Sequence, residues 1–210
     1  MILFQPLQPL RRVAVLALLL LAGGCSGLLP KAPPPPQFYA LDGGASVSTG
    51  PVSKPGGRTL IVSPLTAAPG YDSARIVYVQ QPHQLAHFAQ SEWVDTPARM
   101  LAPQVVAALA ASGAFAAVVA GPTGAAGDLR LDLALLRLQH EFTGPQHQLR
   151  LTLRATLVDT ATRRVRLQRL FDHTVDTQRD DAYAGVLAAN QATAEVLRAL
   201  VSMASETVGP

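Results

Sequence analysis

Hydrophobic and polar residues alternate along the chain between residues 128 and 176. The alternation is clearest over residues 149–157, where every odd position is leucine or alanine and every even position is arginine or threonine. A period of two predicts a β-strand with one face in the core and the other in water. This stretch is therefore interpreted as a strand of a sheet that is covered on one side only.

The same period continues on both sides of this stretch. Before it, leucines alternate from Leu129 to Leu135, and the pattern then slips by one residue, which a β-bulge near Leu135 and Leu136 would explain. Turns at residues 143–145 and 159–162 would join three such strands into an antiparallel meander. The apolar positions of the third strand are Val165, Leu167, Phe171 and Val175.

The first half of the chain contains further strand candidates. Residues 58–65 form a continuous apolar run with β-branched residues, which predicts a strand that is buried on both faces. Residues 74–80 also offer apolar side chains to both faces and are expected near the centre of the sheet. Shorter segments at 38–41, 84–88 and 114–120 predict additional strands.

Residues 92–113 are predicted to contain a helix. Asp95 or Thr96 is the candidate N-cap, Pro97 falls in the first turn, where a missing N–H costs nothing, and Gly113 ends the helix. Apolar residues at helical spacing are expected to form its buried stripe. That stripe consists of Leu101, Val105, Leu109 and Ser112.

A second, alanine-rich helix is predicted after Asp180, which is its candidate cap. Two helices and a largely antiparallel sheet with one apolar face predict an α+β domain of two layers, in which both helices pack on one face of the sheet. The expected buried face of the second helix consists of Tyr183, Leu187, Asn190, Ala194, Leu197 and Val201.

The N-terminus has the pattern of a lipoprotein signal. Arg11 and Arg12 form a positive segment, residues 13–22 are an apolar run too short for a stable membrane-spanning helix, and two glycines precede Cys25, the sole cysteine. We expect cleavage before Cys25 and acylation of its thiol, so that residues 1–24 are removed. A secretory signal with an unmodified cysteine and an uncut membrane anchor are the alternatives.

Residues 25–37 are predicted to be a lipidated cysteine followed by a proline-rich tether, and residues 38–210 a single periplasmic α+β domain. Four consecutive prolines favour an extended polyproline II segment, which acts as a semi-rigid spacer. Residue 26 is serine and not aspartate, which favours the outer membrane by the sorting rule of enteric bacteria. The domain is thus expected to be lipid-anchored at the outer membrane and to face the periplasm.

The charge balance argues against nucleic acid as a partner. The chain has 17 basic and 14 acidic residues, and loss of Arg11 and Arg12 with the signal leaves 15 basic residues and a net charge of +1. Nucleic-acid binding depends on many contacts between phosphates and lysine or arginine side chains. Binding to the membrane is instead expected through the lipid anchor.

No catalytic motif is found in the sequence, which has no GxSxG elbow, HExxH pair, phosphate loop or GxGxxG. His83 and His87 are four residues apart, but Pro82 argues against a helix that would align them, and no third ligand is near. His140 and His147 flank a turn and are interpreted as a solvated hairpin end. We predict a protein that is not an enzyme and has no metal or cofactor.

Candidate partner-binding residues lie on the polar face of the meander and at two aromatic positions. Alternation places arginines on the outer side of adjacent strands, where they are either solvated or contact an acidic protein or lipid headgroups. Trp93 is interpreted as a core residue or hydrophobic staple, with an interface role as the alternative. The candidates are Arg150, Arg154, Arg164, Arg166, Trp93 and Tyr71.

Several segments, in this order along the chain, resemble one known family, the auxiliary lipoproteins of ABC transport systems that work with MCE-domain proteins, including the paraquat-inducible type. The tryptophan followed by an amphipathic helix is the most specific of them. The segments are the lipobox at Cys25, Phe38–Leu41, Ser63–Leu65, Tyr71–Tyr78, Glu92-Trp93 with residues 97–115, and Leu157–Val165.

The resemblance implies an α+β fold without catalytic residues at the outer-membrane end of a lipid-transport assembly. It also implies an MCE-domain periplasmic protein as partner, with the ABC permease and ATPase as separate chains. The resemblance leaves open whether the protein also forms homo-oligomers. A lipid-anchored envelope hydrolase or ligand-binding module is the alternative function, but a hydrolase needs a nucleophile beside a base, and no serine or histidine has such a setting in the sequence.

Overall fold

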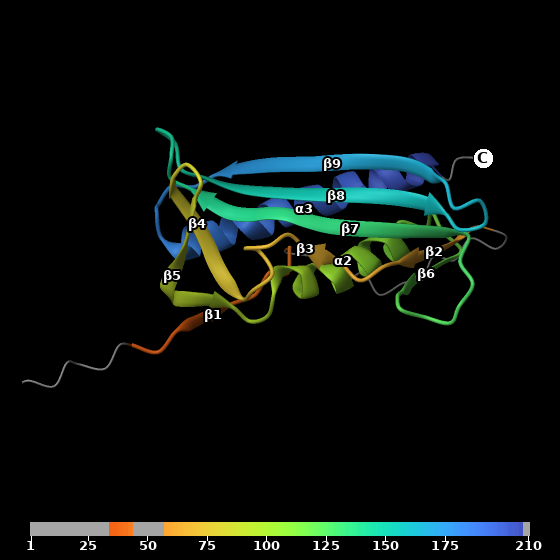
Figure 1. Cartoon of the computed structure of the whole chain (residues 1–210), viewed down its shortest axis with the longest axis horizontal. Coiled ribbons are helices and arrows are strands. Elements are labelled where there is room, and N and C mark those ends of the chain that lie inside the picture. The colour runs from red at the N-terminus through yellow and green to blue at the C-terminus, as the bar shows by residue number, and fades with distance from the viewer. Residues whose placement is uncertain (1–33, 44–56, 208–210) are drawn as a thin grey trace, which may run out of the picture. The chain divides into compact units, whose positions relative to one another are not determined.

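The computed structural model describes residues 34–43 and 57–207. The predicted signal, Cys25, Ser26 and most of the predicted tether lie outside these residues. Within them, no helix is long and apolar enough to cross a membrane. Figure 1 shows the arrangement of helices and strands. The elements are β1 (Gln37–Tyr39), β2 (Thr59–Val62), β3 (Thr66–Ala67), β4 (Arg75–Gln81), β5 (Gln84–Trp93), α2 (Pro97–Ala111), β6 (Ala117–Ala120), β7 (Leu129–Glu141), β8 (Gln148–Asp159), β9 (Val165–Asp176) and α3 (Ala182–Thr207).

Strands β7, β8 and β9 form the predicted antiparallel meander. Leu131 pairs with Leu157, and Leu153 pairs with Phe171, so the alternating apolar residues of all three strands lie on one face. The register of β7 and β8 shifts between Leu135 and Arg137, as expected for the predicted bulge. The long-range pattern of period two therefore specified both the pairing and the irregularity.

The other edge of β7 is covered by three short strands in succession. Strands β2, β3 and β4 all run parallel to β7 and pair with its start, middle and end. Strand β6 then pairs with β2, β5 with β4, and β1 with β5, which completes a nine-stranded mixed sheet. The sheet is thus centred on β7, the strand with the longest run of buried leucines.

Helix α2 is shorter than the predicted segment. Glu92 and Trp93 belong to β5, and the helix begins at Pro97 with Thr96 as N-cap. Gly113 follows the helix with a φ of 65°, a left-handed conformation that glycine adopts without strain. The predicted buried stripe is confirmed at Leu101, Val105 and Leu109, whereas Ser112 is the exposed C-cap.

The predicted cap of α3 was wrong, and so was most of its predicted buried face, of which Leu197 is buried. Asp181, not Asp180, caps the helix by accepting a hydrogen bond from the Ala184 N–H, 2.7 Å long. Tyr183 and Leu187, expected in the core, are 49% and 53% exposed. The face against the sheet instead consists largely of small residues, which let the helix axis approach the strands closely; it comprises Ala182, Gly185, Val186, Ala189, Ala192, Thr193, Val196, Leu200 and Met203.

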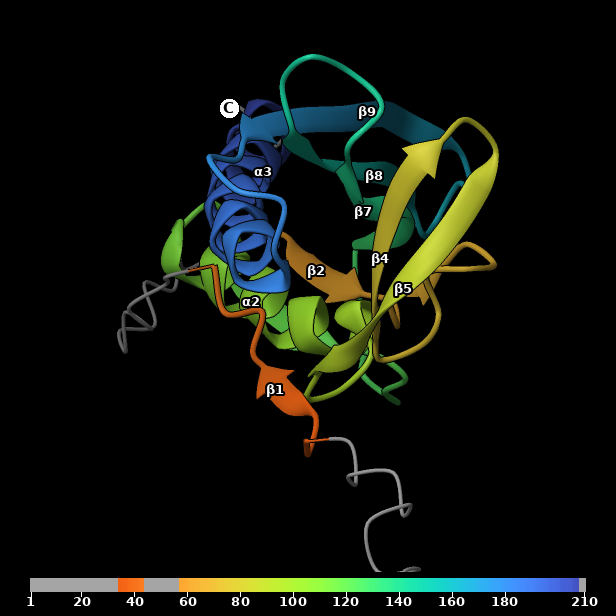
Figure 2. The same cartoon turned by 90° about the vertical axis from the view of Figure 1, so that its left-hand side faces the viewer.

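Both helices pack on the same face of the sheet, which confirms the two-layer α+β prediction. Figure 2 shows α2 and α3 next to each other on one side of β7 and β8. The opposite face of β7, β8 and β9 has no helix of the described chain on it. Residues from α2, α3 and β8 meet where the layers join: Leu101, Val105, Leu151, Leu153, Val196 and Leu197.

The orientation of α3 makes a direct prediction. Leu187→Ala should change the free energy of unfolding by no more than about 0.5 kcal/mol, because Leu187 is largely solvated. Ala189→Leu should lower it by about 2 kcal/mol, since Ala189 is fully buried and overpacking forces the helix from the sheet. Urea unfolding measures both. Equal effects of the two substitutions would show that the helix faces the sheet with a different side.

Candidate docking surface

The sheet face opposite the helices is polar, and we call it the outer face. Its side chains occupy the even-numbered positions of β8 and β9, between the buried leucines, and the positions of β7 that pair with them. The outer face consists of Arg130, Asp132, Ala134, Arg137, Gln139, Glu141, Gln148, Arg150, Thr152, Arg154, Thr156, Val158, Arg166, Gln168, Leu170, Asp172, Thr174 and Asp176.

Arg150 is held in place by a neighbouring carboxylate on β9. Its Nε and Nη2 atoms donate to the two oxygens of Asp172 at 2.9 and 2.5 Å, and the Thr152 hydroxyl donates to Asp172 Oδ1 at 2.8 Å. The Arg150 hydrogen bonds lower the pKa of Asp172 to about 2. Arg150 is therefore a fixed, paired charge with a defined orientation, and not a freely solvated side chain.

Tyr71 joins the outer face from the loop before β4. Its hydroxyl donates to Gln139 Oε1, and Gln139 Nε2 in turn donates to Glu141 Oε1 at 2.6 Å. Gln148 Nε2 donates to the other carboxylate oxygen of Glu141 at 3.0 Å. Tyr71 is only 9% exposed, and burial raises its pKa. The structure thus connects Tyr71 to one end of the outer face through a chain of hydrogen bonds.

Arg154 differs from Arg150 because it is exposed and makes no ion pair with any described residue. It lies opposite Leu170 in the neighbouring strand, and Leu170 is 57% exposed. An unpaired cation beside an exposed leucine is a combination suited to a protein partner. The period of two could have indicated Leu170, since it falls between the apolar positions of its strand.

The remaining predicted arginines lie toward the end of the outer face. Arg166 Nη2 is 2.6 Å from Asp159 Oδ2, and Arg164 occupies the turn before β9 and is exposed. Val165, expected on the apolar face, is 58% exposed because it begins the strand at this open end. The structure therefore brings Arg150, Arg154 and Arg166 to one face and places Arg164 at its margin.

Trp93 lies elsewhere. It is the last residue of β5, its N–H donates to the Ala74 carbonyl oxygen, and its side chain is 3% exposed in the hydrophobic core. Its burial in this structure matches the core interpretation and leaves almost no side-chain surface for a partner.

The histidines form no metal site with other described residues, in which no group of three potential ligands occurs. His140 was wrongly interpreted as part of a solvated hairpin end. It is fully buried beneath the start of α3, with Nε2 at 2.7 Å from Thr177 Oγ1, and burial lowers its pKa to about 4. The ring is therefore neutral at physiological pH and belongs to the core.

The fold and the outer face define a class of protein: an α+β domain with two helices on one face of a mixed sheet and an open polar face. A family model described as ABC-type transport auxiliary lipoprotein component matches residues 39–201. The chain belongs to this family, as the sequence resemblance indicated. No curated protein matches the chain by sequence.

Solved structures show the same fold. Protein XCC0632 from Xanthomonas campestris is 25% identical, with a TM-score of 0.68 over 82% of this chain and 94% of that one. A second structure, of a protein described as uncharacterized, is 15% identical, with a TM-score of 0.62 over 81% and 99%. Lipoprotein GNA1162 from Neisseria meningitidis is 9% identical over 70% and 96%, with a TM-score of 0.38, too low to support an argument.

Proposed function

We propose that the protein is the non-enzymatic docking component of an intermembrane lipid transporter of the ABC/MCE type. Acylated Cys25 anchors it to the outer membrane, and the domain faces the periplasm and docks an MCE-domain protein there. The ABC permease and ATPase are separate chains. Membership of the auxiliary lipoprotein family supports the role in transport.

The docking proposal rests on the properties of the outer face. It is folded on three long strands, no helix of the described residues covers it, and it combines oriented arginines with an exposed leucine. Charges arranged in this way give steering and specificity more than affinity. The matching surface of the partner is therefore acidic with an apolar residue opposite Leu170.

Reversing two charges of the outer face tests this role. We expect the Arg150→Glu, Arg154→Glu double variant to associate with the purified MCE-domain protein roughly threefold or more slowly at low salt, and the difference to shrink as salt screens it. Stopped-flow or surface binding kinetics across a salt series measure it. Because Arg150→Glu places a carboxylate beside Asp172, the Arg154→Glu single variant is measured as well.

The matched control reverses two exposed arginines on the helices, Arg99→Glu with Arg198→Glu, which changes the net charge equally on the other side of the sheet. This variant should lose much less of the association rate. Equal rates for all variants would mean that the arginines of the outer face are merely solvated. If no MCE-domain protein crosslinks to the wild type in intact cells, the docking function itself fails.

A further inference from the structure

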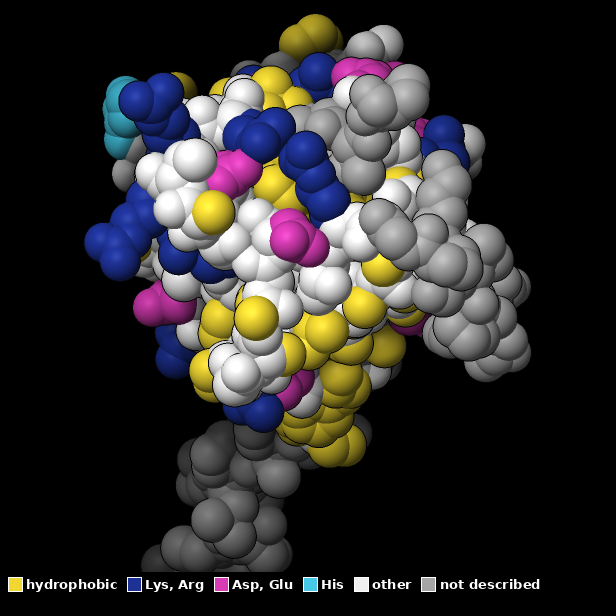
Figure 3. Space-filling view, turned by 90° about the vertical axis from the view of Figure 1, so that its right-hand side faces the viewer, with side chains coloured by type: hydrophobic (Ala, Val, Ile, Leu, Met, Phe, Trp, Pro, Cys, Tyr) yellow, Lys and Arg dark blue, Asp and Glu magenta, His cyan; other side chains and the backbone are white. Residues whose placement is uncertain are grey.

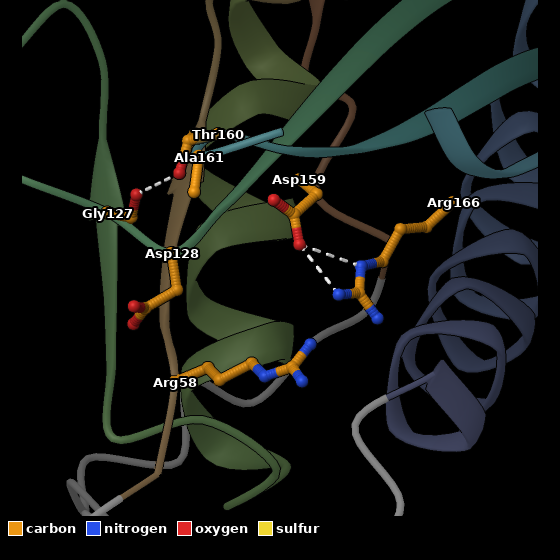
Figure 4. A pocket seen from close by; sticks show the side chains of 7 residues that line it. All are labelled: Arg58, Gly127, Asp128, Asp159, Thr160, Ala161 and Arg166. Atoms are coloured by element: carbon orange, nitrogen blue, oxygen red, sulfur yellow. Dashed lines mark hydrogen bonds and ion pairs between the residues drawn. The ribbon is translucent and has the colours of Figure 1, made fainter. Parts of the chain in front are cut away.

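A cleft lies at the end of the sheet, at the margin of the docking surface, with which it shares Arg166. It has a volume of about 410 Å³ and opens where β2 and β7 begin and where β8 turns into β9. Figure 4 shows the side chains around it. The lining residues are Arg58, Gly127, Asp128, Asp159, Thr160, Ala161 and Arg166.

The walls of the cleft are fixed by hydrogen bonds between three chain segments. The Asp128 N–H donates to the Thr59 carbonyl oxygen at 3.0 Å, and the Thr160 N–H donates to the Asp128 carbonyl oxygen at 3.1 Å. Asp128 Oδ2 accepts the Thr59 N–H at 2.7 Å, and its carboxylate points away from the space between the two arginines (Figure 4). The site is thus built on strand ends and not on a loose loop.

Both carboxylate oxygens of Asp159 already accept hydrogen bonds. Oδ2 accepts hydrogen bonds from Arg166 Nε and Nη2 at 3.0 and 2.6 Å, and Oδ1 accepts from the Thr162 N–H and hydroxyl at 2.9 and 3.0 Å. These bonds lower the pKa of Asp159 to about 2. The carboxylate therefore orients Arg166 and has little capacity left to accept from Arg58.

The Arg58 guanidinium has a nitrogen whose N–H groups lack a hydrogen-bond acceptor. Its Nη1 atom is shielded from solvent and has no hydrogen-bond partner in the described part of the chain. A guanidinium carries five N–H donors and accepts none, so a shielded nitrogen without an acceptor is unfavourable. In Figure 4 the guanidinium groups of Arg58 and Arg166 face the same space. An anion placed between them would supply the missing acceptor.

The surrounding charge also favours an anion. Two arginines and two aspartates line the cleft, and both aspartates already accept hydrogen bonds. Two more arginines, Arg163 and Arg164, are exposed in the turn that follows Ala161. Figure 3 shows arginine side chains, with acidic ones between them, on the upper part of this end of the molecule, and hydrophobic side chains below. The local potential is therefore positive.

We propose that this cleft binds a phosphate group, carried by inorganic phosphate or by the headgroup of a phospholipid. Guanidinium groups bind phosphate oxygens in pairs of parallel hydrogen bonds, and two guanidiniums around one space suit a group with several oxygens better than a single carboxylate. This inference does not depend on the docking role, because Arg58 lies outside the outer face and the docking test leaves Arg166, which belongs to both sites, unchanged.

The test uses the full-length protein in dodecyl maltoside, at an ionic strength held constant with chloride. Inorganic phosphate should raise the melting temperature of the wild type in a dose-dependent way and should bind by calorimetry. Arg58→Gln should weaken that binding at least tenfold and, because no described residue pairs with the lost group, fold normally by circular dichroism. Arg58→Lys should retain part of the affinity, and Arg154→Gln, outside the cleft, all of it.

Further titrations identify the source of the phosphate. If monomeric short-chain phosphatidylglycerol binds more tightly than inorganic phosphate, and Arg58→Gln abolishes that tighter binding, the cleft binds a lipid headgroup. If inorganic phosphate binds more tightly than the lipid, the cleft binds free phosphate. If acetate binds as tightly as inorganic phosphate, the assignment of the cleft to phosphate is overturned. If inorganic phosphate, phosphatidylglycerol and acetate all fail to bind, or if Arg58→Gln leaves their binding unchanged, the cleft is not an anion site. The association kinetics of the Arg150 and Arg154 variants test the docking role separately.

Discussion

A Cys25→Ser variant is expected to lose its acyl chains completely and to be absent from the outer membrane. The thiol is needed to form the diacylglyceryl thioether, and serine cannot replace it in that bond. Two or more acyl chains give stable membrane attachment, and no helix of the described domain could substitute for them. Intact-mass measurement of the membrane-extracted protein, together with density-gradient fractionation, gives the result.

Ser26→Asp is the companion to this variant. It should keep the full acyl mass and move the protein to the inner membrane, provided that the host follows the enteric sorting rule. A wild-type protein that begins at Met1, or that carries an unmodified Cys25 in the soluble periplasm, would contradict the anchor. Outer-membrane retention of the serine variant would show that another part of the chain holds it there.

The sheet could be predicted where one pattern acts over many residues. Alternation over β7, β8 and β9 indicated the strands, their buried face and the bulge near Leu135, because a one-residue slip would have moved every leucine into water. Sequence reasoning could not place β2, β3 and β4 in succession along β7, since these parallel pairings join residues far apart in the chain.

The helix errors have a common physical cause. An apolar stripe predicts which side of a helix is buried when large residues mark it, but α3 has alanines around much of its circumference. Because the helix lies close to the sheet, small residues face the sheet, and the larger Tyr183 and Leu187 face solvent. Similarly, Trp93 pairs with Tyr39 in a neighbouring strand, so tertiary pairing determined its conformation rather than the helix that follows.

The candidate sites were predictable to different degrees. Alternation was enough to place Arg150, Arg154 and Arg166 on the outer face. It could not reveal that Asp172 fixes Arg150, and the cleft around Arg58 requires the ends of three distant segments to meet.

His140 should make the protein less stable as the pH falls from about 6.5 to about 4. The ring is fully buried, and at Gly185 on α3 an added Cβ would lie 2.9 Å from its Nδ1, so the helix leaves no room for water beside it. Burial and, to a smaller extent, the nearby His147 lower the pKa of His140 from 6.5 to about 4, against the opposing effect of Asp181 and Asp180. Between these values the unfolded chain binds a proton that the native protein excludes, so the free energy of unfolding falls with pH.

The full shift from 6.5 to about 4 corresponds to about 3 to 4 kcal/mol, at roughly 1.4 kcal/mol per pH unit. Urea unfolding at pH 7.0, 5.5 and 4.5 measures most of this loss, above the range in which Asp159 and Asp172 take up protons. His140→Gln removes the titrating group and should flatten most of the pH dependence, even if the variant is less stable at every pH. Burial also lowers the pKa of His87, so His87→Gln is the matched control and should remove a smaller part of the slope. A His140→Gln variant with the wild-type slope would show that His140 does not exclude the proton and that its ring reaches solvent in solution.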